Sequence, residues 1–314
     1  MELTVILTAY KEERTIAKAI RNICDEGISG YKKNFQFITV IPDTPTNFAA
    51  AEEIKKYSNV TWTKLIDPGK GKPMALNIAL QEAKGKIIVL TDGDVYFKEN
   101  SLSTLIRAFE NTKVMGGTGR PVSANSRANF WGYISHLLAD AAHHKRLTTL
   151  KSIRSGRSRV FLGSKSNFFV LSGYIFAMRN LQLLLPEDTL VDDAYLSYQL
   201  LLKGGKLEYV PDAIVYVNYP DNLKDWYRQK LRAVGGYVQL WKYGVVTDKT
   251  KVRNFWKEAQ YFWFPIKYAK NTTELFWSLL LYPLRLIMWI LIFYQQRIRH
   301  KSLDDIWVRI ESTK

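Results

Sequence analysis

Strand-like apolar runs alternate with helix-like periods over the first two thirds of this 314-residue chain. Strands buried on both faces have continuous apolar runs, and the helices between them supply the crossovers of a parallel sheet. Four such repeats predict an α/β fold of the doubly wound kind, in which a mostly parallel sheet is flanked by helices. The expected strands are residues 3–8, 35–41, 60–65, 87–91 and 114–118, and the expected helices are 12–25, 47–57, 73–83 and 101–111.

The pattern changes after the fifth expected strand. We expect a helix at 130–147, a loop rich in Ser, Arg and Lys at 151–165, a strand at 168–178, a helix at 192–203 and a strand at 206–217. Long loops in compact domains are often functional.

Carboxylates follow two of the expected strands. Asp43 comes shortly after the second strand, and Asp92-Gly93-Asp94 follows the fourth. A buried carboxylate is costly unless it binds a cation or a substrate, and ligands bind at the carboxyl ends of parallel strands. Mg²⁺ commonly takes one or two carboxylates together with substrate phosphates, and a glycine between two aspartates allows a tight turn. The pattern favours a site for a metal-bound diphosphate, with an ordinary Asp-Gly turn as the alternative.

Two adjacent aspartates, Asp192 and Asp193, open the helix expected at 192–203. A carboxylate at this position is stabilised by the helix dipole and can serve simply as a cap. It can also act as a general base if it lies within hydrogen-bonding reach of an acceptor hydroxyl. Two neighbouring carboxylates allow one residue for each role.

The chain carries 45 Lys and Arg against 29 Asp and Glu, a formal net charge of +16. Such a charge attracts nucleotides, phospholipid head groups and nucleic acids, and by itself it does not choose among them. A single cysteine, Cys24, excludes an internal disulfide framework and a Cys-based zinc site. The sequence opens on a strand without a basic and apolar leader, so we expect the catalytic part to lie in the cytosol.

The last third is rich in tryptophan, because seven of the nine Trp residues lie after residue 220. Trp and Tyr interleaved with Lys and Arg are typical of a membrane-water boundary, where one end of the ring is apolar and the other is wet. We therefore expect a catalytic domain at 1–220 and membrane-associated helices, amphipathic, interfacial or hydrophobic, at 221–314.

The segment 275–294 is long enough to cross the apolar core of a bilayer, which is about 30 Å thick. It contains Pro283 and Arg285 near its middle, and basic residues flank both ends, which does not suit a single crossing. We favour an in-plane or re-entrant helix pair hinged at Pro283. A single span and a buried helix of a soluble protein remain open.

Five short motifs follow one another in a characteristic order. Residues 8–16 (TAYKEERTI) open the series, followed by 69–77 (GKGKPMALN), Asp92-Gly93-Asp94, 191–196 (VDDAYL) and 229–233 (QKLRA). The combination resembles glycosyltransferase family 2, and most closely its membrane-associated branch related to polysaccharide synthases. The resemblance covers residues 3–240. The chain departs from the family pattern at Lys11 (usually Asn), Asp192 (usually Glu) and Ala233 (usually Trp).

The resemblance implies a GT-A fold with C-terminal membrane-associated helices and a role for each matching residue. Asp94, with Asp92, would bind the metal, and Asp193 would be the catalytic base. Gly173 would form part of the floor of the sugar pocket. The residues implied to bind the donor or the acceptor are Ala9, Glu12, Asp43, Lys72, Asp92, Gly173, Asp192, Gln229 and Arg232.

The resemblance further implies a metal-dependent, inverting hexosyltransferase that uses Mg²⁺ or Mn²⁺. The expected donor is a UDP-sugar, with a GDP-sugar as the second choice, and the expected acceptor is lipid-linked or another glycan. We expect the protein to be associated with a membrane, its catalytic domain to be cytoplasmic, and nucleic acid not to be a partner.

Two alternatives come from other functional classes. A sugar-nucleotide nucleotidyltransferase needs a Gly-rich loop after the first strand, where this chain has Ala-Tyr-Lys-Glu at 9–12. A non-catalytic basic protein that binds membranes or nucleic acid would explain the net charge, but it would not need aspartates at the ends of strands and helices.

Overall fold

The computed structural model describes residues 2–31, 35–154, 168–246, 261–297 and 311–313. The chain divides into two compact units, the first built from residues 1–121 and 170–217 and the second from residues 122–169 and 218–313. The assignment of catalysis to 1–220 and of membrane association to 221–314 stays a prediction. The division into compact units does not test which residues catalyse a reaction or bind a membrane.

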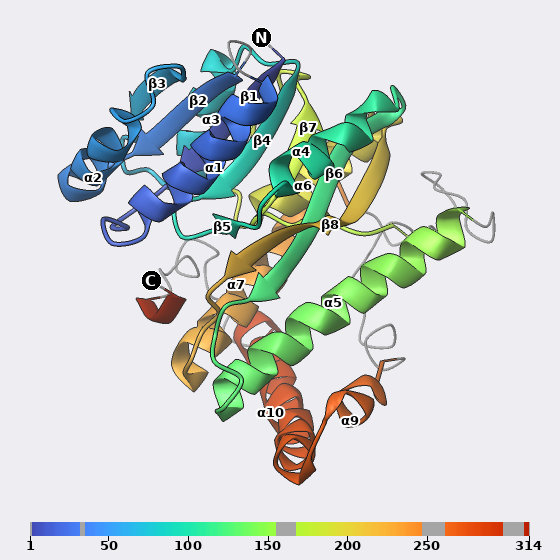
Figure 1. Cartoon of the computed structure of the whole chain (residues 1–314). Helices are drawn as coiled ribbons and strands as arrows, with labels where there is room; N and C mark the ends of the chain where they lie inside the picture. Colours follow the sequence, from blue (N-terminus) through green and yellow to red (C-terminus); the bar gives the residue numbers. More distant parts are fainter. Residues whose placement is uncertain (1, 32–34, 155–167, 247–260, 298–310, 314) are drawn as a thin grey trace. The chain divides into compact units, whose positions relative to one another are not determined.

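An eight-stranded sheet has the order β3-β2-β1-β4-β7-β6-β8-β5 (Figure 1). β3, β2, β1 and β4 are parallel, which confirms the expected parallel arrangement for this half of the sheet. The other half departs from it, because β7 runs antiparallel to both β4 and β6, and β5 runs antiparallel to β8. The bounds are β1 Leu3–Thr8, β2 Phe35–Ile41, β3 Thr61–Ile66, β4 Ile87–Asp92, β5 Tyr96–Phe97, β6 Val114–Ser123, β7 Phe176–Arg179 and β8 Lys206–Val217.

The helices of the first unit cover both faces of the parallel strands. α1 packs against α2 and α4, whereas α3 contacts β1 and β2. Right-handed crossovers place α1 and α2 on one face and α3 on the other, because the chain moves outward from β1 to β3 and then returns to β4 (Figure 1). The bounds are α1 Ile16–Tyr31, α2 Thr44–Ile54, α3 Lys72–Glu82, α4 Ser101–Arg107, the short η2 Ala108–Glu110 and α6 Asp192–Leu202.

The core of this unit lies around β1 and β2, whose residues are all buried. The return of the chain from β3 to β4 creates a topological switch point between β1 and β4. In register, Thr8 at the end of β1 lies opposite Asp92 at the end of β4. In doubly wound sheets, ligands bind in the crevice outside the strands at such a point.

A strand was expected at 168–178, but only Phe176–Arg179 joins the sheet. The backbone before it bonds to side chains instead. The Leu171 N–H donates to Ser197 Oγ over 3.0 Å, and the Ser172 N–H donates to Thr118 Oγ1 over 3.1 Å. Side chains thus satisfy these two backbone N–H groups in place of a neighbouring strand. An apolar sequence pattern does not show which partner a backbone group will find.

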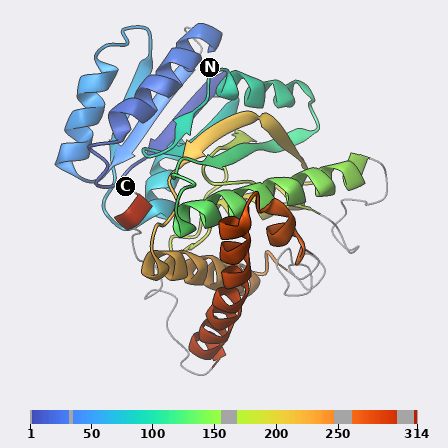
Figure 2. The same ribbon diagram turned by 60° about the horizontal axis from the view of Figure 1, so that its bottom comes forward.

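The second unit contains the remaining helices, and α10 crosses α5 within it (Figure 2). α5 continues beyond the expected end at residue 147, so the first residues of the expected 151–165 loop are helical and residues 155–165 lie outside the described part of the chain. The bounds are α5 Phe130–Arg154, α7 Leu223–Lys242, α9 Phe264–Tyr268, α10 Thr272–Arg297 and η4 Glu311–Thr313.

α10 is a single helix with Pro283 inside it. The expected division into two helices at Pro283 is therefore wrong. Proline removes one backbone hydrogen bond and bends a helix, and packing on both sides of it can hold the two halves in line. Ser278 and Leu281 before the proline and Met288 after it are all buried, which supplies this packing.

Candidate active site

The turn that follows β4 lies against the loop that follows β1. The Thr8 hydroxyl donates to Asp92 Oδ1 over 2.8 Å, and the Gly93 N–H donates to the Thr8 carbonyl over 3.0 Å. A Cβ atom at Gly93 would lie 2.5 Å from Glu12 Oε2 and 2.9 Å from the Ala9 Cβ. Because both distances are shorter than van der Waals contact, only glycine fits here without a shift of its neighbours. Ala9 and Glu12 are thus packed directly against the Asp92 turn.

Lys72, the first residue of α3, joins the two acidic clusters. Its Nζ lies 2.7 Å from Asp92 Oδ1 and 3.7 Å from Asp192 Oδ2. Burial by itself would lower the pKa of Lys72, but the Asp192 and Asp92 carboxylates outweigh burial and raise it. The ammonium group therefore stays charged, and it holds the end of β4 and the start of α6 at one point.

Asp193 follows Asp192 on α6. Its Oδ2 accepts the Gly173 N–H over 3.1 Å, and its Oδ1 accepts the Ala194 N–H over 2.7 Å. The N-cap residue of α6 is Val191, so neither aspartate occupies the capping position. Burial, followed by the Asp192 charge, raises the pKa of Asp193 to about 6. The carboxyl group therefore titrates close to the range that suits a general base near neutral pH.

Asp43 has a structural role that the sequence analysis missed. As the N-cap of α2, it accepts the Thr46 N–H at Oδ1 over 2.9 Å, and it accepts the Lys11 N–H at Oδ2 over 2.9 Å. Lys11 has a left-handed backbone (φ 53°), a region in which asparagine is enriched. Burial raises the pKa of Asp43, but hydrogen bonds from Thr46 and Lys11 lower it overall. A carboxylate followed by Pro45 is a helix-start signal that could have identified the cap.

Within the first unit, the structure brings several of the predicted site residues together. Lys72, Asp92 and Asp192 form one ion-paired group, and Asp193 is joined to Gly173. Gln229 and Arg232 lie on α7 in the second unit, where both are half-buried. Their expected place near the acceptor and the diphosphate stays a prediction, as do the expected roles of Ala9, Glu12 and Asp43 beside the nucleotide.

The residues around the β4 turn suit a divalent cation. Asp92 ends the strand, and Asp94, two residues later, is 8% exposed. Over the residues that the structure describes, no group of three or more His, Cys, Asp and Glu side chains is placed to hold a metal. Two carboxylates alone are nevertheless a normal protein contribution to a Mg²⁺ site that takes its other ligands from substrate phosphates and water.

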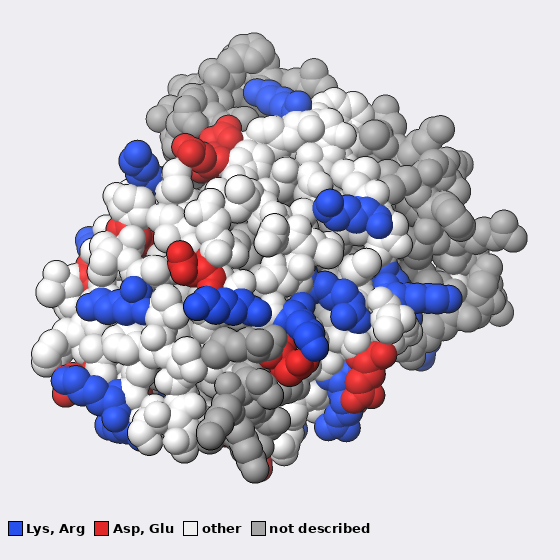
Figure 3. Space-filling view, turned by 90° about the horizontal axis from the view of Figure 1, so that it is seen from above, with Lys and Arg blue, Asp and Glu red and all other residues white. Residues whose placement is uncertain are grey.

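The net positive charge does not by itself decide whether nucleic acid is a partner. Figure 3 shows one face of the molecule, on which Lys and Arg side chains are scattered, with acidic side chains between several of them. Proteins that bind nucleic acid gather their basic residues into a patch or stripe that follows the phosphate backbone. One face does not test for such a patch, so the expectation that nucleic acid is not a partner stays a prediction.

The chain matches the family model described as "Glycosyltransferase like family 2" over residues 2–236. It belongs to this family. The assignment that rested on five short motifs is thereby confirmed, and the match covers every helix and strand of the first unit together with α5 and most of α7.

Curated relatives in glycosyltransferase family 2 have low identity and are longer than this chain. The beta-monoglucosyldiacylglycerol synthase of Trichormus variabilis is 23% identical over 261 residues, which are 81% of this chain and 53% of that protein. The poly-beta-1,6-N-acetyl-D-glucosamine synthase of Staphylococcus aureus is 25% identical over 255 residues, which are 79% of this chain and 58% of that protein. The chain thus spans a little over half the length of these relatives.

Solved structures confirm the GT-A type of α/β fold. The mannosyltransferase PcManGT from Pyrobaculum calidifontis, in complex with GDP-Man and Mn²⁺, aligns with a TM-score of 0.59 and 15% identity over 97% of this chain and 83% of that chain. S. aureus TarS 1–349 in complex with UDP-GlcNAc aligns with a TM-score of 0.50 and 14% identity over 75% of this chain and 66% of that chain. At these identities the likeness establishes the fold alone.

Proposed function

We propose that this chain is a metal-dependent, inverting glycosyltransferase that moves a sugar from a nucleotide-diphosphate sugar to a hydroxyl group. The observation that carries the proposal is the Lys72 bridge. The Lys72 Nζ atom lies 2.7 Å from Asp92 Oδ1 in the β4 turn and 3.7 Å from Asp192 Oδ2 at the start of α6. It therefore brings these two acidic segments together. Family membership, which rests on residues 2–236, supports the same reaction class.

Asp193 and Gly173 act at the acceptor end of the proposed reaction. Asp193 takes the proton of the acceptor hydroxyl as that oxygen attacks the sugar, and its pKa of about 6 leaves it ionised at neutral pH. The Gly173 N–H holds one oxygen of Asp193, so the carboxylate keeps a fixed orientation. Attack from the face opposite the leaving nucleotide inverts the anomeric centre in one displacement. No carboxylate nucleophile is needed.

The diphosphate end of the donor belongs beside the β4 turn. Asp92 and Asp94 would hold Mg²⁺ or Mn²⁺, whose charge would offset the negative charge that develops on the leaving diphosphate. Lys72, whose Nζ lies 2.7 Å from Asp92 Oδ1, would add a fixed positive charge beside that turn. Ala9, Glu12 and Asp43 are proposed to lie beside the nucleotide, and Gln229 and Arg232 near the acceptor and the diphosphate.

The donor is proposed to be a UDP-sugar, with a GDP-sugar as the second candidate. Both kinds of donor occur among proteins with the same fold, since the TarS structure holds UDP-GlcNAc and the PcManGT structure holds GDP-Man. The base-binding residues of this chain do not by themselves choose between uracil and guanine, so the donor must be measured.

The acceptor is proposed to be a lipid-linked sugar or another glycan at a membrane, with the catalytic unit on the cytoplasmic side. The support is α10, whose residues Thr272–Leu291 form one helix long and apolar enough to cross a membrane. Only 22% of the most apolar stretch of this helix is buried. An exposed apolar face of this extent is typical of a contact with lipid or another protein.

α10 buries polar as well as apolar residues, whereas its exposed side is largely apolar. Its buried side includes the polar residues Glu274 and Ser278, spaced at one helical turn. Its exposed side carries large apolar residues, namely Leu275, Phe276, Leu279, Leu280, Leu286, Ile287, Ile290 and Leu291. Arg285, which argued against insertion, is half-buried rather than part of this exposed apolar set.

Donor hydrolysis tests the proposal. The wild-type chain is incubated with UDP- and GDP-sugars, with Mg²⁺, with Mn²⁺ and with a chelator, and release of the nucleoside diphosphate is followed. We expect metal-dependent release from one donor class, its loss in Asp193→Asn with donor binding retained, and no change in Glu187→Gln, an exposed carboxyl before α6. Wild-type turnover in Asp193→Asn would remove this residue as the base, and no release from any donor would refute the proposed function.

A further inference from the structure

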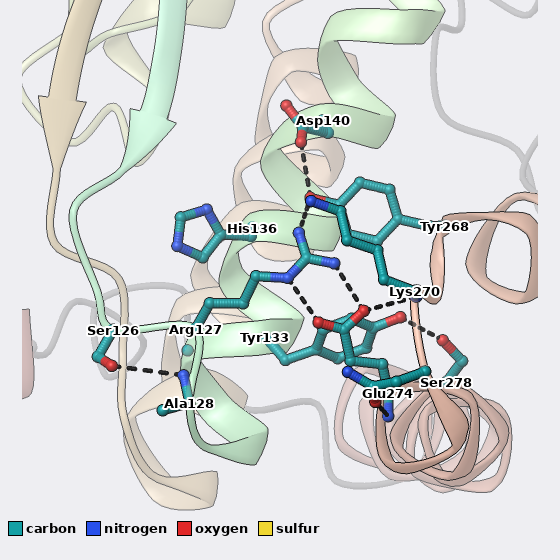
Figure 4. Close-up of polar contacts among 12 residues, drawn as sticks. Ser126, Arg127, Ala128, Tyr133, His136, Asp140, Tyr268, Lys270, Glu274 and Ser278 are labelled. Atoms are coloured by element: carbon teal, nitrogen blue, oxygen red, sulfur yellow. Dashed lines mark hydrogen bonds and ion pairs between the residues drawn. The ribbon is translucent and has the colours of Figure 1, made fainter.

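One arginine ties three segments of the second unit together (Figure 4). Arg127 lies in the connection between β6 and α5, and its Nε and Nη2 donate to the two oxygens of Glu274 over 2.7 and 2.8 Å. Its Nη1 donates to the Tyr268 hydroxyl over 2.9 Å, and that hydroxyl donates to Asp140 over 2.7 Å. Arg127 therefore fixes the first turn of α10 and the end of α9 against the segment that precedes α5.

The same short segment also holds the chain that leads into α7. The Asn125 side chain donates to the Tyr219 carbonyl over 3.0 Å and accepts the Tyr219 N–H over 2.8 Å. The Asn125 carbonyl accepts a bond from His136 Nε2 over 2.8 Å, which anchors the segment on α5. Tyr219 lies three residues before Asn222, the N-cap of α7.

We propose that residues 124–129 form a joint that couples α10 to α7, with Arg127 and Asn125 as positioning residues for Gln229 and Arg232. The inference rests on the proposed function for the role of the last two residues and for the contact of α10 with lipid. A bidentate pair between a guanidinium and a buried carboxylate tolerates little change of geometry, so a shift of α10 must move Arg127 or break the pair. Asn125 lies two residues away and is hydrogen-bonded to the Tyr219 backbone, so a movement of Arg127 also moves the segment that leads into α7.

The joint offers a physical reason for an enzyme of this kind to work at a membrane. The outward face of α10 is apolar, whereas Gln229 and Arg232 lie on α7. If α10 lies in lipid, the bilayer sets the position of its first turn. The joint then makes the position of α7 depend on that of α10, so binding to lipid orders the helix that is proposed to contact the acceptor.

A second set of contacts on α10 provides a matched control. Ser278 shares a hydrogen bond of 2.6 Å with the Tyr133 hydroxyl and donates to the Pro265 carbonyl over 2.8 Å. These bonds fasten α10 to α5 and to α9. The Ser278 side chain makes them without a hydrogen bond to residues 124–129, and the Tyr133 ring meets that segment only by stacking, 5.2 Å from the Arg127 guanidinium. Loss of Ser278 therefore loosens α10 but leaves the route from Arg127 to Tyr219 intact.

Hydrogen exchange tests the joint in the full chain bound to phosphatidylcholine vesicles that contain phosphatidylglycerol. We expect Arg127→Gln to speed exchange in the first turns of α7 by about tenfold, the upper part of the range for coupling through a residue network. Asn125→Ala should speed exchange in these turns to the same extent, and Arg127→Lys should give a rate between those of Arg127→Gln and wild type. Ser278→Ala, the control, should leave the exchange rate of α7 within about twofold of wild type. Because Arg127 and Asn125 act in series, the double variant should exchange no faster than the faster single variant.

Unchanged exchange of α7 in Arg127→Gln, or equal acceleration in Ser278→Ala, would overturn the joint and leave Arg127 with a local packing role. If Arg127→Gln does not fold, the comparison of Asn125→Ala with Ser278→Ala decides in the same way. Donor hydrolysis is measured on the same samples. Its absence in the wild type would count against the proposed reaction while the exchange comparison would still judge the joint.

Discussion

The substitution Asp192→Asn should move the acidic limb of the pH-rate profile to lower pH. Asp193 must be ionised to accept a proton, so activity is present above its pKa and is lost as the pH falls through about 6. Burial is the larger cause of the raised pKa, and the Asp192 charge is the next. Replacing Asp192 with the isosteric amide removes that charge while the Lys72 to Asp92 contact of 2.7 Å remains.

The size of the effect follows from the ionised fraction of Asp193. With a pKa of about 6, about one tenth of the groups are ionised at a pH of about 5. A neighbouring like charge commonly contributes about one pKa unit, equal to about 1.4 kcal/mol. Its removal would leave about half of the groups ionised at that pH, so the rate should rise about fivefold relative to wild type. At a pH of about 8 both proteins are fully ionised, so the ratio should not change for this reason.

The assay is kcat/KM for the donor over this pH range, at saturating metal, because this constant reports the pKa of the free enzyme. Each variant is compared with its own rate at high pH, so any loss of donor affinity through Lys72 cancels. The reasoning is refuted if the acidic midpoint is the same in wild type and Asp192→Asn, or if the wild-type midpoint lies near the ordinary pKa of aspartate.

Three further predictions test other parts of the molecule. Asp94→Ala should weaken metal-dependent donor binding at least about tenfold, and donor affinity that is indifferent to chelator in the wild type would contradict this role. Gly93→Ala should lower the free energy of unfolding by about 1–3 kcal/mol, because its Cβ would lie 2.5 Å from Glu12 Oε2, and an unchanged denaturant midpoint would show that the turn can shift freely. Replacing the exposed Leu286 and Ile290 with lysine should reduce sedimentation with lipid vesicles without changing donor hydrolysis, and equal sedimentation would separate this face of α10 from the membrane.

Local patterns predicted the first unit well. The strand expected at 206–217 has the same bounds as β8, and the first two strands agree with β1 and β2. β1 and β2 are apolar because they are buried on both faces, so their composition records their environment directly. In β8, buried and more exposed residues alternate towards its end, which gives the period of a half-buried strand. The acidic turn after β4 was also predicted, since a carboxylate pair at a strand end stands out against an apolar run.

Other features depend on contacts between residues far apart in the sequence. No local pattern links Lys72 to both Asp92 and Asp192, because their meeting requires α3, β4 and α6 to converge at one edge of the sheet. The double use of Asp43, as a helix cap and as an acceptor for the Lys11 N–H, likewise requires β1 and β2 to lie side by side. The Asp193 pKa arises from burial, which only packing creates.

α10 separates the two kinds of information most clearly. Its sequence determined that a long apolar segment exists and that it contains a proline and an arginine. Only the tertiary structure decided that the helix continues through Pro283 and that Glu274 faces inward to Arg127 while the leucines face outward. The physical reason is that hydropathy is a sum over residues, whereas the direction of each side chain is set by the partner against which the helix packs.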